Sequence, residues 1–131
     1  MLPEKAVDFI KAAEQDLSAM EDLRYFEFKS ANAVCFHAQQ YAEKIIKAKL
    51  IEMGIVPPRT HDLYTLLEYF DDSESIQRAR EHCSILAQYE ATTRYPYEGF
   101  VYNTPEEAEE AYNLTLEIPH LIGIYDSNEN E

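Results

Sequence analysis

Apolar residues recur every three or four positions along most of the chain, which is the period of an amphipathic helix. This pattern predicts four helices, over about 3–22, 31–53, 74–90 and 105–125, and a shorter one over 61–70. No segment shows the strict alternation that is typical of a half-buried strand. The sequence therefore predicts an all-α protein.

Turn and capping residues mark the ends of the predicted helices. Gly54 follows the second helix as a C-terminal cap, and Thr60 is the predicted N-cap of the short helix. In "TPEE", Thr104 caps the last helix and Glu107 completes a capping box. Pro119 is expected to end or kink this helix.

Short connections between long helices favour antiparallel neighbours. We therefore expect an antiparallel, up-and-down four-helix bundle with an additional short helix. The 131 residues are expected to form a single domain, with residues 126–131 as a flexible acidic tail.

The charge of the chain restricts its partners. The net charge is −14, and residues 61–131 carry −13 of it. General binding to nucleic acid is unexpected, because phosphates must be neutralised by cations. A protein partner with a basic surface would suit the acidic half.

Several kinds of site have no signature in the sequence. No apolar run approaches the ~20 residues that span a membrane, and the N-terminus resembles no signal peptide, so we expect a cytoplasmic protein. With three glycines and no metal motif, no cofactor or metal site is predicted. Cys35 and Cys83 are expected to be buried thiols, with a disulfide or a metal role as the alternative.

One face of the second helix carries polar residues at helical spacing. They are His37, Gln40, Lys44 and Lys47. Glu43 precedes Lys47 by four positions, which suits an ion pair. The face is either an ordinary solvated surface or the polar floor of a groove for an anionic or nucleotide ligand.

The segment "TTRYPYEGF" is rich in aromatic residues. Arg94 offers a fork of donors for phosphate or carboxylate, and Tyr95 and Tyr97 can stack on a base or fill an interface. A loop pinned onto the bundle is the alternative. Arg78 and His82, one turn apart, suit either RNA cleavage or a plain surface pair.

Three stretches in this order resemble the HEPN domain family: "CFHAQQYAEKIIKAKL" at 35–50, "THDL" at 60–63 and "TRYP" at 93–96. The resemblance extends over almost the whole chain. It implies a prokaryotic helical bundle that forms a homodimer and acts with a minimal nucleotidyltransferase, in a toxin–antitoxin-like module or a two-part nucleotidyltransferase.

The resemblance also implies a ligand or partner site on the dimer. Residues inside the family motifs would line a groove for a nucleotide or the partner, namely His37, Gln40, Lys44, His61, Arg94 and Tyr95. If the partner adenylylates this chain, Tyr95 or Tyr97 is the candidate acceptor.

One departure from the family matters for catalysis. Ribonuclease members carry an arginine followed, after four to six residues, by a histidine, and no arginine here has a histidine in that window. The sequence therefore favours a non-catalytic binding subunit with no catalytic residues. The alternatives are a ribonuclease toxin with a degenerate site built on Arg94, His37 or His61, and a purely structural dimeric scaffold.

Overall fold

The computed structural model describes residues 2–90 and 102–124. Five α-helices and one turn of 3₁₀-helix account for most of these residues. They are α1 (Glu4–Tyr25), α2 (Ala31–Glu52), α3 (Leu63–Leu67), α4 (Glu74–Leu86), η1 (Ala87–Tyr89) and α5 (Pro105–Ile122). The described part contains no strand, so the predicted all-α class is confirmed. None of its helices is long and apolar enough to cross a lipid bilayer.

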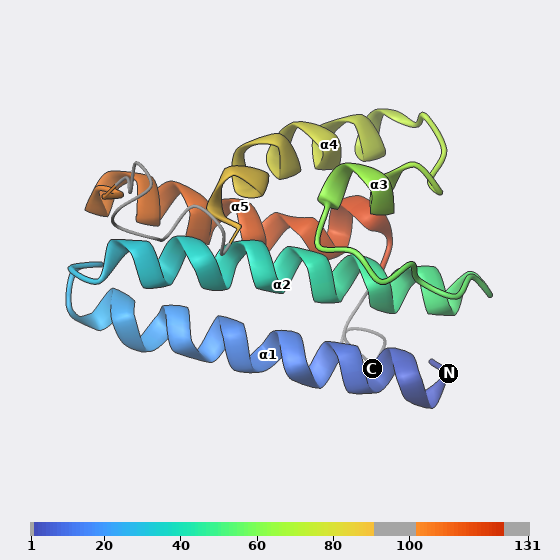
Figure 1. Cartoon of the computed structure of the whole chain (residues 1–131), viewed down its shortest axis with the longest axis horizontal. Helices are drawn as coiled ribbons and strands as arrows, with labels where there is room; N and C mark the ends of the chain where they lie inside the picture. The colour runs from blue at the N-terminus through green and yellow to red at the C-terminus, as the bar shows by residue number, and fades with distance from the viewer. Residues whose placement is uncertain (1, 91–101, 125–131) are drawn as a thin grey trace.

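The four long helices alternate in direction along the sequence (Figure 1). Consequently α2 and α5 run the same way, and two hydrogen bonds tie their matching ends. At one end the backbone N–H of Asn103 donates to Asn32 Oδ1 at 2.7 Å. At the other end Lys49 Nζ donates to the carbonyl of Gly123 at 3.2 Å.

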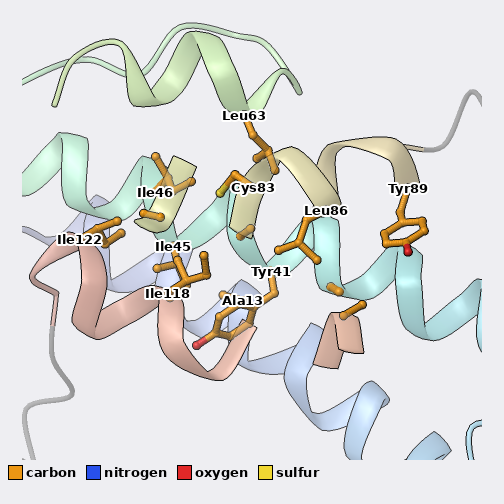
Figure 2. Close-up of a cluster of buried hydrophobic side chains, with 14 of the residues drawn as sticks. Ala13, Tyr41, Ile45, Ile46, Leu63, Cys83, Leu86, Tyr89, Ile118 and Ile122 are labelled. Atoms are coloured by element: carbon orange, nitrogen blue, oxygen red, sulfur yellow. The ribbon is translucent and has the colours of Figure 1, made fainter. Parts of the chain in front are cut away.

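Helix α2 is the centre of the bundle. It packs along α1 on one side and α5 on another, while α3, α4 and η1 cover a third part of its surface. Its buried residues therefore face several directions rather than one stripe. Figure 2 shows Tyr41, Ile45 and Ile46 of α2 within the cluster that also holds Leu86 and Ile118.

The C-terminal ends of α2 and α5 close with the same glycine motif. After α2, Gly54 has φ +83°, its N–H donates to Ile51, and the N–H of Ile55 donates to Leu50. Glycine adopts this left-handed conformation at little cost, and the two bonds satisfy carbonyls that the helix leaves open. Gly123 closes α5 in the same way, and the predicted capping box at Thr104 opens that helix.

Several predicted boundaries are wrong. Helix α1 continues to Tyr25 instead of ending near residue 22, α3 ends at Leu67 instead of near residue 70, and Pro119 lies inside α5 without ending it. Thr60 does not cap α3; its hydroxyl accepts from the N–H of Asp62, and Asp62 accepts from the N–H of Tyr64 as the actual cap. His61 therefore precedes the helix instead of opening it. Helix α5 ends at Ile122, three residues before the predicted end, because Gly123 turns the backbone out of the helix.

Cys35 and Cys83 are free and buried, as expected. Burial among apolar neighbours raises the pKa of each thiol from 9.0 to about 12, and Glu107 adds to the shift at Cys35. The thiols thus stay protonated and unreactive across the physiological pH range.

We expect the free energy of unfolding to fall as the pH rises above 9 toward 12. Thiols of the unfolded chain ionise near 9.0, whereas the buried thiols ionise only near 12, so alkali favours the unfolded state in this window. Urea titrations at several pH values measure the fall. Cys83→Ala should make it shallower, and Ser84→Ala, at an exposed neighbouring position, should not. Identical pH slopes for Cys83→Ala and the wild type would contradict the assignment.

Candidate functional site

Polar side chains of α2 and of two neighbouring segments form two hydrogen-bonded groups, which we treat together as one cluster. We call it the helix-two cluster; its members are Asp16, His37, Gln39, Gln40, Glu43, Lys44, Lys47 and His61. Asp16 comes from α1, and His61 comes from the segment before α3. Two buried carboxylates, Asp16 and Glu43, organise the cluster, one in each hydrogen-bonded group.

Asp16 holds two of the predicted site residues. Its Oδ1 accepts from His37 Nδ1 at 2.8 Å, and its Oδ2 accepts from Lys44 Nζ at 2.6 Å. The side chain of Asp16 is only 8% exposed, so water competes little for these bonds. Because a carboxylate only accepts, His37 must carry its proton on Nδ1. In the neutral ring this leaves the lone pair of Nε2 available for other contacts.

Glu43 organises the other half. Its carboxylate accepts from Lys47 Nζ at 3.0 Å and from His61 Nδ1 at 3.0 Å. The predicted pair of Glu43 and Lys47 is therefore formed, but inside the protein: the side chains are 6% and 11% exposed. Such a pair is costly to break, because either partner alone would be an uncompensated buried charge.

Two glutamines connect the Glu43 half to the surface. Gln39, fully buried, donates through Nε2 to the carbonyl of His61 at 3.2 Å and to Glu43 at 3.4 Å. Gln40 Nε2 in turn donates to Gln39 Oε1 at 2.7 Å. No buried side-chain polar atom of the described residues lacks a partner. The cluster is thus preorganised rather than loosely solvated.

Exposure decides which members can meet a ligand or a partner. The side chain of His61 is 67% exposed, that of His37 30% and that of Lys44 26%. Each carboxylate faces one lysine, so the charges within each half cancel. The cluster therefore offers directional hydrogen bonds and two histidines, but little net positive charge for an anion.

Four predicted site residues lie in the cluster, namely His37, Gln40, Lys44 and His61. The burial of Lys47 and Glu43 excludes the alternative of a simple solvated face. Arg94, Tyr95 and Tyr97 lie outside the described residues. His82 does not pair with Arg78; its Nε2 contacts Glu117 of α5 at 3.1 Å.

Asp16 and Gln39 were missed as cluster residues and Glu43 was predicted only as the partner of Lys47, although the sequence carried a signal for further roles. Asp16 stands three residues after Ala13 and four before Met20, so it interrupts the apolar stripe of α1. Glu43 likewise precedes Ile46 by three. A polar residue in a stripe position must find a partner inside, which helical spacing alone could not name.

The described residues contain no group of three or more histidine, cysteine or acidic side chains placed to hold a metal ion. The helix-two cluster can form hydrogen bonds, and the imidazole groups of His37 and His61 can also exchange protons.

Comparison with known proteins places this geometry in a family. The family model of the HEPN domain matches residues 6–125. The chain belongs to the HEPN family. The match includes all five α-helices apart from the first residues of α1, and it includes every residue of the helix-two cluster.

A solved structure supports the assignment. The crystal structure of ST0689, described as an archaeal HEPN homologue, superposes with a TM-score of 0.69 at 28% sequence identity. The alignment covers 92% of this chain and 97% of the homologue. No curated protein matches the chain.

The geometry of the helix-two cluster predicts unequal costs for two similar substitutions in α2. Glu43→Gln should lower the free energy of unfolding by about 3 kcal/mol, because it leaves the Lys47 ammonium buried without a counter-charge. Glu52→Gln removes the partner of Lys49 in a more exposed pair and should cost less than about 1 kcal/mol. Urea denaturation of both variants measures the difference.

A further substitution tests the reason for the cost. Glu43→Gln/Lys47→Met removes both charges and should recover most of the stability lost in Glu43→Gln. Equal losses in Glu43→Gln and Glu52→Gln would show that burial of the Glu43 pair has no energetic consequence.

Proposed function

We propose that this HEPN protein is a non-catalytic binding subunit that acts with a minimal nucleotidyltransferase, in a toxin–antitoxin-like or two-part enzyme. The surface of the helix-two cluster, together with Arg94, Tyr95 and Tyr97, would contact the partner or its nucleotide. The observation that carries the proposal is the preorganised pair of buried carboxylates, which hold His37, Lys44 and His61 in fixed positions.

Preorganisation favours binding because little side-chain entropy remains to be lost when a partner docks. His61 is the most exposed of the charged members of the cluster, and its Nδ1 is bonded to the buried carboxylate of Glu43. Hydrogen-bonding groups without net positive charge suit a protein surface better than a free polyphosphate. The acidic second half of the chain would attract a basic face of the same partner and raise the association rate.

A homodimer belongs to the same proposal. The segment with Arg94 starts after Tyr89 and ends before Asn103, which is bonded to Asn32 near the start of α2. This end of α2 lies about one and a half turns from His37. A second copy that packs there would extend the binding surface across two chains, which light scattering of the purified protein would detect as twice the monomer mass.

Capture of the partner from the native organism tests the proposal. The tagged wild type should recover a nucleotidyltransferase, identified by mass spectrometry, and His61→Ala/Arg94→Ala should lose it. His120→Ala/Arg78→Ala is the matched control, because it removes the same residue types at exposed positions outside the cluster. His61 is preferred to His37 as a target because its removal leaves the Asp16 half intact.

Equal recovery of the nucleotidyltransferase by both double variants would show that the contact lies on another surface. Recovery of no nucleotidyltransferase by the wild type would contradict the proposal and leave the dimeric scaffold as the simpler function.

A degenerate ribonuclease site is the second candidate, and one observation favours it. The bond from His37 Nδ1 to the buried Asp16 carboxylate fixes the ring and leaves Nε2 for proton transfer. A buried carboxylate that orients a histidine ring is one part of a general acid–base site. In this case, Arg94 would be the phosphate-binding partner.

The ribonuclease candidate predicts RNA cleavage by the purified protein without metal ions and growth arrest on expression. His37→Gln should abolish both, because glutamine cannot exchange protons near neutral pH, and His120→Gln should keep both. Uncleaved RNA with the wild type would eliminate this candidate while leaving the binding-subunit proposal untouched.

A further inference from the structure

An open pocket lies beside the helix-two cluster. Its lining residues belong to the end of the bundle where α1 begins and α2 ends, and Figure 1 shows these two helix ends side by side. Its volume is about 510 Å³, which is within the range of small-molecule sites. Three segments form its walls: Lys5 and Phe9 of α1, Lys47 and Ile51 of α2, and residues 54–59 after α2. It lies at the opposite end of α2 from Asn32 and Asn103.

The lining of this pocket contrasts with the rest of the chain. Ten lining residues drawn at the average composition would include about two acids and about one base. The actual lining contains no acid and three bases, namely Lys5, Lys47 and Arg59. The remaining residues are apolar apart from one glycine. The pocket thus joins an apolar wall to a local excess of positive charge.

Two of the three cations, Lys5 and Arg59, form no ion pair with any residue that the structure describes, and both are exposed. Lys47 is held by Glu43 through one hydrogen bond, and an ammonium has three donors. Even with Glu43 counted, the pocket keeps about two positive charges. Acidic residues farther from the pocket than the Debye length of ~8 Å are screened, and Glu4 and Asp8, which flank Lys5 and Phe9 in α1, do not line the pocket.

The walls are fixed before any ligand arrives. The Gly54 turn, with its two closing hydrogen bonds, sets the direction in which the chain leaves α2. Pro57 and Pro58 then restrict the backbone, and the N–H of Thr60 donates to the carbonyl of Pro58 at 2.9 Å. The arginine fork of Arg59 is therefore carried on a stiff segment that faces two helices.

We propose that this pocket binds a small organic anion that joins a ring-sized apolar body to a phosphate group. The body would lie against Phe9 and Ile51, and the phosphate would be held by Lys5 and Arg59, with a further donor from Lys47. An arginine fork with two ammonium groups is a common arrangement for phosphate oxygens. The site does not depend on the nucleotidyltransferase partner, so the two proposals can fail separately.

The probe is 1-naphthyl phosphate, compared with neutral 1-naphthol and with inorganic phosphate, each titrated into the ¹⁵N-labelled protein at low salt. Naphthyl phosphate should shift the amide signals of Phe9, Ile51 and Gly54 and should bind at least about tenfold more tightly than either half alone. AMP, titrated in parallel, tells whether a nucleotide is a member of the accepted class.

Two double variants test the charges. Lys5→Gln/Arg59→Gln should weaken the binding of naphthyl phosphate at least about tenfold. Lys11→Gln/Arg78→Gln changes the net charge equally at exposed positions outside the pocket and should leave the binding unchanged.

The absence of shifts with naphthyl phosphate would overturn the proposal. Equal weakening in both double variants would overturn it too, because the effect would then reflect only the overall charge. Binding of naphthol as tight as that of its phosphate would rule out an anion site.

Discussion

The burial of α2 on several sides is the constraint on which the rest of the structure depends. A helix that is covered by α1, α5 and the α3–α4 layer has no fully wet face. Every polar residue that it carries must therefore find a partner inside the protein or reach out past a neighbour. The helix-two cluster is the result, because Asp16 and His61 supply from adjacent segments the partners that α2 cannot provide for itself.

The same constraint separates two kinds of surface along α2. Where a carboxylate is buried beside a lysine, the charges cancel and the remaining feature is a fixed set of donors. Beside Lys47 the lining of the pocket contains no acid, and the positive charge of Lys5 and Arg59 is left open to solvent. A neutral, rigid patch suits recognition of a protein, whereas the cationic pocket suits a small anion. Neighbouring positions on one helix can thus serve different partners.

The sequence was sufficient for the fold because the signals were local. Helical period, the capping box at Thr104 and the glycine at Gly54 each depend on a few neighbouring residues, and the structure confirms them. The cap of α3 was wrong because Thr60 and Asp62 compete for the same local bonds. The interior partners Asp16 and Gln39 could not be named in advance, since their contacts span more than twenty residues. The pocket could not be predicted for the same reason, because its three basic residues lie far apart in the sequence.

The burial of Tyr89 and the hydrogen bond of Asn103 have an evolutionary consequence. Tyr89 is buried, and Asn103 is fastened to Asn32, so the two flanks of residues 91–101 are anchored independently of what lies between them. Doubling the length of such a connection costs only about 0.6 kcal/mol in closure entropy. Insertions between the anchors can therefore be tolerated during evolution at little cost to the stability of the bundle.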